Sequence, residues 1–339
     1  MSRVNAPGVI RGAVIATGFV VFPLLVTTPY LMTFAIFTVM YAALASAWNL
    51  LGGFSGYLSL GHAAFFGIGA YAEAIIFTHI GVGGGYRPFA MVPLIGVGVA
   101  LASIPIGIVA LRVRAATFAI VTISLLFIVQ LLAFNLRSLT NGAQGMSMPI
   151  PPFPVATFER PFYYGMVAVF LLSVLISWTV ATGKLGLMLF AIRDDEDRAH
   201  GLGIRVTYAK VVAFAVSAGL SAMPGAIWAY YEGFIYPQFA VDPLVTIGAV
   251  LMAFLGGRGT IWGPMLGALI LVPAQQYLAY SQGASQLYLI GYSAVFLVIM
   301  LLMPRGILPS VRDLLVSRNP FGRRAGNGES PPTPRGVVT

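Results

Sequence analysis

The densest group of ionisable side chains lies in the hexapeptide Arg193-Asp194-Asp195-Glu196-Asp197-Arg198, which holds four of the ten acidic residues of this 339-residue chain. Only 9 % of the chain is charged, and long apolar stretches lie on both sides of the hexapeptide. Carboxylates at this density could bind a metal ion or a substrate, or they could contact a soluble partner. Because such a cluster cannot remain in lipid, we interpret it as a surface segment that contacts a partner.

The order of residues in this segment predicts a short helix. Asp194 is a good N-cap, and Asp197 then takes the third helical position, where an acidic side chain stabilises the helix start. Gly201 or Gly203 can end the helix. We expect a rigid helix of one or two turns, with Lys184 and Lys210 on either side of it at the membrane surface; the alternative is an ordinary polar loop.

A second unusual stretch, Asn49–Tyr71, combines glycines with polar residues inside an apolar region. Non-helical backbone at membrane depth is tolerated only where it is packed in protein or lines water. The stretch is therefore either part of a transport pathway or a tight helical hairpin. The candidates for lining a pathway are Asn49, Gly53, Ser55, Gly56, Ser59, His62 and Glu73.

Glu73 lies ten residues into a predicted span, about 15 Å deep by helical rise. A carboxylate at that depth is costly and suggests a functional role. It could meet the ammonium group of a substrate, or it could be protonated and bonded to a neighbouring helix. We favour the structural role.

Small residues recur every four positions at several places, which is typical of close helix packing in membranes. The packing candidates are Gly67 with Ser59 and Ala63 before it, then Ser217, Ser221 and Gly225, and finally Gly263 and Gly267.

The sequence offers no catalytic or metal-binding constellation. There is no Cys, and the three His residues are scattered. No phosphate-binding loop of the G-x-x-x-x-G-K-[ST] type is present, so we expect this chain to hydrolyse no ATP and to bind no cofactor.

The composition predicts an integral, all-α membrane protein, because 58 % of the residues are hydrophobic and the mean hydropathy is +0.90. A helical span needs about 20 apolar residues. Ten candidates result: Gly12–Tyr30, Met32–Leu51, Ala63–Ile80, Phe89–Leu111, Ala115–Phe134, Phe162–Thr182, Ala209–Tyr231, Pro243–Gly256, Ile261–Tyr280 and Gln286–Met303. The eighth is short, so it either begins deep in the membrane or continues from a broken segment around Gly233–Asp242.

The distribution of basic residues sets the orientation. With both termini in the cytoplasm, 16 of the 19 Lys and Arg residues lie inside, and the other three, Arg87, Arg137 and Arg160, lie outside. This excess follows the positive-inside rule, and attraction to lipid headgroups accounts for the net charge of +9 without any nucleic acid. The hexapeptide then lies on the cytoplasmic face.

Three stretches together resemble the permease subunits of branched-chain amino-acid ABC transporters, of the LivM type. They are Asn49–Tyr71, Ala191–Ile204 and the segment Leu255–Pro264 with Gly267-Ala268 after it. The resemblance covers about residues 40 to 305. It departs from the family pattern at Arg198, at Gly201, where Gly costs about 1 kcal/mol relative to Ala, and at Glu73.

The resemblance implies a fold like that of the vitamin B12 importer (type II), with about ten helices. It implies one transmembrane domain over residues 1–316, a cytoplasmic coupling loop over 184–210, and a disordered tail over 317–339. The residues that it assigns to ATPase coupling are Arg193, Asp194, Asp195, Glu196, Asp197, Arg198, Ala199, Leu202 and Gly203.

The implied protein is a permease subunit in a bacterial inner membrane, which moves branched-chain amino acids inward by alternating access. Its implied partners are a second permease of the LivH type, two ATPase subunits that bind ATP and Mg²⁺, an extracytoplasmic substrate-binding protein and membrane lipid. The alternatives are an importer of the same class for urea, amides or other amino acids, and an ion-coupled secondary transporter.

Overall fold

The computed structural model describes residues 18–19, 21–23, 26, 28–81, 84–282, 293–294, 297–298, 301 and 306–310. This part of the chain is mostly α-helical, as predicted. The long helices are α2 (Pro29–Ser55), α4 (Arg87–Ala110), α5 (Ala115–Asn135), α7 (Glu159–Thr182), α10 (Val206–Glu232) and α13 (Gly263–Gln282). The shorter ones are α3 (His62–Ile75), α6 (Arg137–Thr140), α8 (Lys184–Asp194), α9 (Glu196–Gly201), α11 (Pro237–Ala240) and α12 (Pro243–Gly256).

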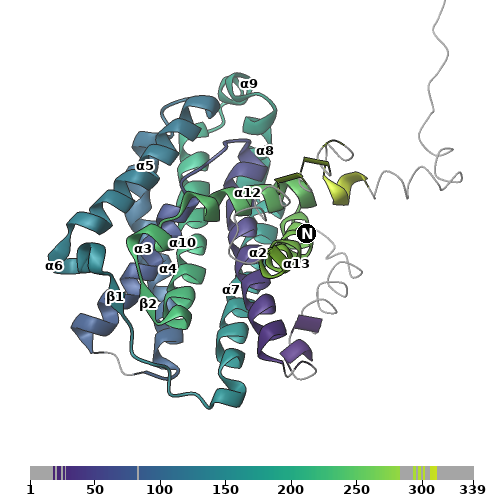
Figure 1. Cartoon of the computed structure of the whole chain (residues 1–339). Helices are drawn as coiled ribbons and strands as arrows, with labels where there is room; N and C mark the ends of the chain where they lie inside the picture. The colour runs from purple at the N-terminus through teal and green to yellow at the C-terminus, as the bar shows by residue number, and fades with distance from the viewer. Residues whose placement is uncertain are drawn as a thin grey trace, which may run out of the picture.

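Helix α10 lies at the centre of the bundle and packs against α2, α3 and α4 (Figure 1). Its side chains are almost all buried because small residues let the neighbouring helices approach closely. A Cβ atom added at Gly219 would lie 2.5 Å from the carbonyl oxygen of Gly96 on α4. No larger residue fits at that crossing.

The outer helices expose their large apolar side chains instead of burying them. Helix α4 exposes Leu94, Val97 and Leu101, and α5 exposes Ile120 and Leu131. Bare apolar surface on this scale is unfavourable in water and favourable against lipid tails. The bundle is therefore built to be embedded in a membrane.

Six helices among the described residues are long and apolar enough to cross a membrane. They contain or overlap most of the predicted spans. The predicted span Ala63–Ile80 corresponds to α3, which has 14 residues, together with the π-helical turn η1 (Ile76–Ile80) that continues it. The predicted spans Gly12–Tyr30 and Gln286–Met303 lie largely outside the described residues, as does the predicted tail 317–339. The count of ten is not confirmed.

The predicted broken segment before the short eighth span is confirmed. Helix α10 ends at Gly233, which has a φ of +72°, and α11 follows before α12 begins. The carboxylate of Asp242 caps α12 by accepting a hydrogen bond from the Leu244 amide at 2.8 Å. Figure 1 draws α12 crosswise to α2, α7 and α10.

The predicted all-α fold misses one small feature. A two-residue strand, β1 (Met146–Ser147), pairs antiparallel with β2 (Phe234–Ile235). The pairing joins the long loop after α5 to the segment after α10. This loop is therefore attached to the bundle at the end opposite α9 (Figure 1).

Candidate functional site

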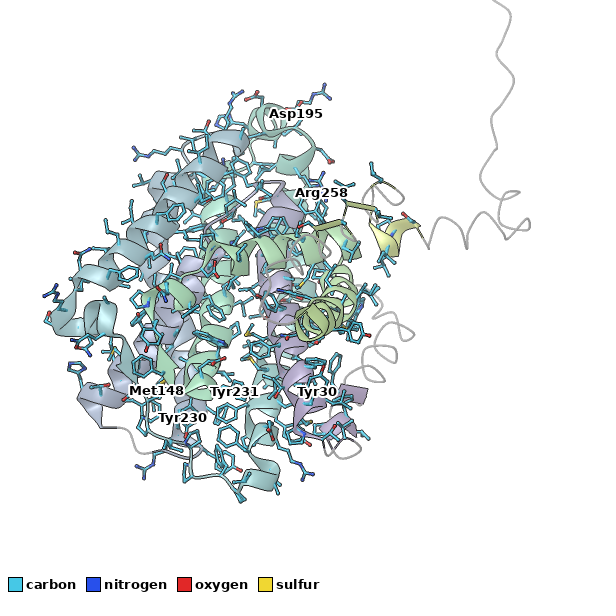
Figure 2. The ribbon with its side chains drawn as sticks, in the orientation of Figure 1. Tyr30, Met148, Asp195, Tyr230, Tyr231 and Arg258 are labelled. Carbon is cyan, nitrogen blue, oxygen red and sulfur yellow. The ribbon has the colours of Figure 1, made fainter. Side chains whose placement is uncertain are left out.

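The charged hexapeptide spans the junction of α8 and α9 and lies at one end of the bundle. Figure 2 shows Asp195 at this end, whereas Tyr30, Tyr230, Tyr231 and Met148 lie toward the other. The predicted short helix is confirmed as α9, which ends at Gly201. The predicted cap is wrong by one residue, because α8 continues through Asp194. Asp195 is the N-cap, and its carboxylate accepts a hydrogen bond from the Arg198 amide at 3.0 Å.

The tip of this segment, formed by α9 and the residues directly before and after it, is exposed. Asp194, Asp197, Arg198 and Gly203 are exposed, while Ala199 is buried under the helix. Leu202 follows directly after α9 and is 82 % exposed among these charged and polar neighbours. A large apolar side chain so exposed beside charges is suited to a partner's pocket.

Two exposed ion pairs cross this surface. Arg114 meets Asp197 at 3.1 Å and Arg198 meets Asp195 at 3.0 Å. Water screens both pairs, so each contributes little to stability. They shape the surface without fixing α9 to the bundle.

A third ion pair, between Lys210 and Glu196, holds α9 to the bundle; the side chain of Lys210 is buried and that of Glu196 is 34 % exposed. The Lys210 ammonium group donates a hydrogen bond to Glu196 Oε1 at 2.8 Å and another to the Tyr57 hydroxyl at 2.9 Å. Tyr57 in turn donates to the second carboxylate oxygen of Glu196. The position of Lys210 at the membrane surface stays a prediction; within the protein its side chain is only 3 % exposed.

Burial alone would raise the pKa of Glu196, but other effects outweigh it. The hydrogen bonds from Lys210 and Tyr57 and the positive charges of Lys210 and Arg114 lower the pKa of this carboxyl below its usual value. Burial, followed by the hydrogen bond to Glu196, raises the pKa of the Tyr57 phenol. Glu196 is therefore ionised and Tyr57 is neutral at pH 7.

Arg193 makes a separate connection between α8 and the end of α2. Its Nη1 donates to the carbonyl oxygen of Gly53 at 2.9 Å. A Cβ atom at Gly56, which has a φ of +78°, would lie 2.9 Å from Arg193 Cγ. Glycine is required at position 56 for both its backbone conformation and its close approach to Arg193.

Asn49 connects the same end of α2 to the loop between α12 and α13. Its amide nitrogen donates to the Thr260 carbonyl at 2.9 Å, and its amide oxygen accepts from the Gly259 amide at 2.7 Å. The three stretches that are far apart in the sequence, around residues 49–71, 191–204 and 255–268, thus meet at one end of the bundle.

His62 joins three helices inside the bundle. Ser217 donates to the Ala47 carbonyl oxygen at 2.6 Å, so it must accept from His62 Nε2, which also lies 2.6 Å away. The other ring nitrogen lies 3.1 Å from Ser59 Oγ. The chain of hydrogen bonds links α2, α3 and α10.

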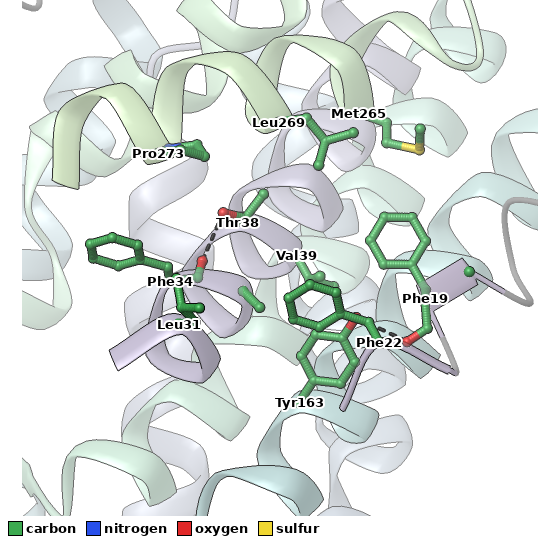
Figure 3. A pocket seen from close by; sticks show the side chains of 12 residues that line it. Phe19, Phe22, Leu31, Phe34, Thr38, Val39, Tyr163, Met265, Leu269 and Pro273 are labelled. Atoms are coloured by element: carbon green, nitrogen blue, oxygen red, sulfur yellow. Dashed lines mark hydrogen bonds between the residues drawn. The ribbon is translucent and has the colours of Figure 1, made fainter. Parts of the chain in front are cut away.

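Most predicted pathway residues are buried in this conformation. Asn49, Gly53, Ser55, Ser59, His62 and Glu73 are all buried, and Gly56 is half-buried. The apolar hollow in Figure 3, of about 510 Å³, contains none of them. Its polar side chains, Thr38 and Tyr163, already donate to backbone carbonyls, so it offers no free donor for a charged solute. Pathway lining stays a prediction.

Glu73 is 1 % exposed, and neither carboxylate oxygen has a hydrogen-bond partner among the described residues. An ionised carboxylate left unpaired in this environment would be strongly unfavourable. The arrangement therefore favours a neutral carboxyl group.

The predicted packing residues lie at helix crossings. A Cβ at Gly67 would meet Ala240 and Val241, one at Gly225 would meet the Phe66 carbonyl, and one at Gly267 would meet Met252. Gly263 lies against Gly256, whereas the hydroxyl of Ser221 donates within α10 itself, to the Ser217 carbonyl at 2.9 Å.

Sequence reasoning missed the buried cluster of Tyr57, Glu196 and Lys210. One available signal is that Lys210, one of only two lysines in the chain, stands just inside a predicted span. A lysine in that position needs a partner, and Glu196 is in the nearest acidic segment.

An apolar bundle whose outer helices expose large apolar side chains, with a charged segment at one end, defines an integral membrane protein. The family described as "Branched-chain amino acid transport system / permease component" matches residues 30–304. The chain therefore belongs to this permease family. It is a component of a membrane transport system and not an enzyme.

Curated relatives agree with this assignment. The chain is 30 % identical to the "High-affinity branched-chain amino acid transport system permease protein LivM" of Salmonella typhimurium, over 83 % of this chain and 70 % of the relative. Identity to the LivM protein of Escherichia coli is 29 %, over 84 % and 71 %. A shorter match, 28 % over 38 % of this chain and 39 % of the relative, is to the "Autoinducer 2 import system permease protein LsrC" of Salmonella paratyphi B. No solved structure matches the chain.

Proposed function

We propose that this chain is the LivM-type permease subunit of an ATP-driven importer of branched-chain amino acids. The family assignment supports the class, and the LivM relatives support the substrate. The chain would move substrate inward by alternating access, using ATP and Mg²⁺ that bind to a separate ATPase subunit. An importer for urea, amides or other amino acids would use the same architecture, but the substrate named for the relatives does not favour it.

The exposed tip around α9 is the proposed docking site for that ATPase. The observation that carries this assignment is Leu202, which is 82 % exposed at a charged tip where lipid cannot cover it. Contact with a partner would remove this apolar side chain from water, which favours association. Asp194, Asp197, Arg198 and Gly203 would form the rim around it.

The orientation follows from the same assignment. The α9 end would face the cytoplasm, and both termini would lie on that side. Arg114 and Arg193 lie beside α9, whereas Arg137 lies at the opposite end on α6, as the positive-inside rule requires. A substrate-binding protein would deliver its ligand at the end formed by β1 and β2.

We also propose the finer architecture of one permease domain over residues 1–316, with ten spans and a fold like that of the vitamin B12 importer. The discontinuous segments, Gly56–Gly61 before α3 and Gly233–Asp242 before α12, support it, since broken helices are typical of transport folds. The complete unit would contain a second permease of the LivH type and two ATPase subunits.

An ion-coupled secondary transporter would use intramembrane charges in pairs. Glu73 has no charged partner among the described residues, which argues against that class.

The docking assignment is tested by co-purification of the ATPase subunit with the assembled permease pair. Leu202→Asp should reduce recovery of the ATPase, because a carboxylate would have to be desolvated in an apolar pocket. Leu139→Asp is the matched control, since Leu139 is an exposed leucine on α6 at the opposite end of the bundle. Equal recovery of the ATPase with both variants would refute docking at Leu202.

The substrate assignment is tested separately with proteoliposomes that contain the complete transporter. Uptake of radiolabelled leucine, isoleucine and valine, competed by an excess of urea or acetamide, compares the two substrate classes. Uptake that urea or acetamide abolishes, and that unlabelled valine leaves unchanged, would contradict the proposal.

A further inference from the structure

Lys210 uses all three of its donors to join four separate elements of the chain. Besides Glu196 on α9 and Tyr57 after α2, its ammonium group donates to the Leu111 carbonyl oxygen at 3.4 Å. Leu111 is the C-cap of α4, where backbone carbonyls lack helical partners and attract positive charge. One side chain on α10 therefore contacts α9, α4 and the segment between α2 and α3.

Burial distinguishes this cluster from the other ion pairs of the same surface. The side chains of Lys210 and Glu196 are 3 % and 34 % exposed, whereas those of Arg114 and Asp197 are 82 % and 77 % exposed. The exposed pair can open and exchange with water at little cost. Opening the pair of Lys210 and Glu196 would leave the buried ammonium group of Lys210 without its counter-ion, so a displacement of α9 acts on Lys210 and on the groups that it contacts.

Tyr57 extends the connection into the membrane helices. It lies between α2 and α3, and its ring packs edge-on against Phe118 of α5 at 5.5 Å between centroids. The Lys210 Nζ atom also lies 4.4 Å from the centre of the Tyr57 ring. A displacement of Glu196 thus acts directly on the segment that precedes α3.

An ion pair with a buried partner is by itself weak evidence for a role in stability. Replacing a buried ion pair by apolar residues of similar size is often neutral or stabilising. Such residues would fill the space, but they would lack the directional bonds that connect α9 to the other three elements. Apolar replacements would therefore preserve stability if the cluster only stabilises the fold, but they would impair coupling if its hydrogen bonds transmit movement.

We propose that Lys210 is a positioning residue for energy coupling: with Glu196 and Tyr57 it forms a buried link that transmits displacement of α9 to the segment between α2 and α3. The proposal rests on the docking of an ATPase at α9. It adds that docking and transmission use different residues, with Leu202 facing the partner and Lys210 facing the bundle.

The test uses the complete transporter in proteoliposomes, with leucine as the transported probe. Three quantities are measured: recovery of the ATPase on purification, the rate of ATP hydrolysis, and leucine taken up per ATP hydrolysed. Lys210→Met should retain the ATPase and its hydrolysis, while uptake per ATP falls by about tenfold, within the usual range for coupling between two sites. Arg114→Gln, which opens only the exposed pair, should keep the wild-type ratio.

The combined variant Tyr57→Phe, Glu196→Leu and Lys210→Met keeps the fold testable because it leaves no buried charge. It should assemble with a melting temperature close to that of the wild type and yet show the same loss of uptake per ATP. A wild-type ratio in this variant overturns the proposal, and so does loss of the bound ATPase, which would assign the cluster to docking. Docking itself is tested independently by the recovery of the ATPase with the Leu202→Asp variant.

Discussion

The hydroxyl oxygen of Ser217 lies 2.6 Å from Nε2 of His62, and both side chains are fully buried. Ser217 has one proton, and the Ala47 carbonyl accepts it, so the imidazole must donate from Nε2. The bond fixes the orientation of the ring at the start of α3 and ties α2 to α10. Polar groups that the sequence suggested for solute contact therefore connect helices in this conformation.

Ser217→Ala should destabilise the protein by about 1–3 kcal/mol, because it leaves the buried N–H of His62 without its acceptor. The matched control is Ser177→Ala. Ser177 is equally buried, but its hydroxyl has no hydrogen-bond partner among the described residues. Removing it should be neutral or stabilising. Thermal unfolding in detergent measures both variants, and a similar loss in each would contradict the hydrogen-bond chain.

Gly225→Ala should destabilise the bundle by about 1–3 kcal/mol, because its Cβ would overlap the Phe66 carbonyl where α10 crosses α3. Gly98→Ala on α4 is the control, since nothing lies within 4 Å of the added Cβ there. That substitution should stabilise the helix by up to about 1 kcal/mol. The sign of the difference in melting temperature decides whether close packing controls position 225.

Glu73→Gln should leave folding and leucine uptake unchanged, because a neutral carboxyl and an amide have nearly the same shape and neither carries a charge. Initial uptake rates and competition among leucine, isoleucine and valine are the measurements. Loss of uptake with retained melting temperature would show that a negative charge at Glu73 contacts the substrate, and the structural role would then be wrong.

The buried ion pair predicts a loss of stability in acid. Because the pKa of Glu196 in the folded protein lies below its ordinary value of 4.5, its contribution is fully present above pH 4.5. It is lost as pH falls through the lower, folded value and the carboxylate is protonated beside Lys210. The melting temperature of Glu196→Gln should therefore fall less than that of the wild type below pH 4.5. Parallel curves for the two proteins would exclude the contribution.

The sequence predicts the structure correctly where a single local rule determines it. Apolar runs of sufficient length predicted the helices, and Gly201 with Gly203 correctly ended α9. The sequence predicts the N-cap of α9 at Asp194 because Asp194 and Asp195 are both suitable N-cap residues. Only the length of α8, which is set by its packing against α2 and α7, selects Asp195.

The site was predictable as a list of segments but not as an arrangement. Nothing in the sequence shows that Asn49 bonds to a loop more than 200 residues away, because pairing at that separation depends on the whole fold. The burial of Lys210 could not be predicted from the sequence for a similar reason. Its position near the end of a span suggests the surface, and only the approach of Glu196 and Tyr57 makes burial of its charge possible.

The start of α3 has a consequence for how the protein is made. The Ala63 amide, one of the donors that every helix leaves unpaired at its beginning, is bonded by the side chain of Thr246, 183 residues further along the chain. Just before it, the Leu60 amide is bonded by Thr122 and the Ser59 carbonyl by Trp48. While ribosomes are still synthesising α10, Trp48 and Thr122 are already available but the Thr246 partner of Ala63 is not. The start of α3 is therefore completed only after α12 has been made.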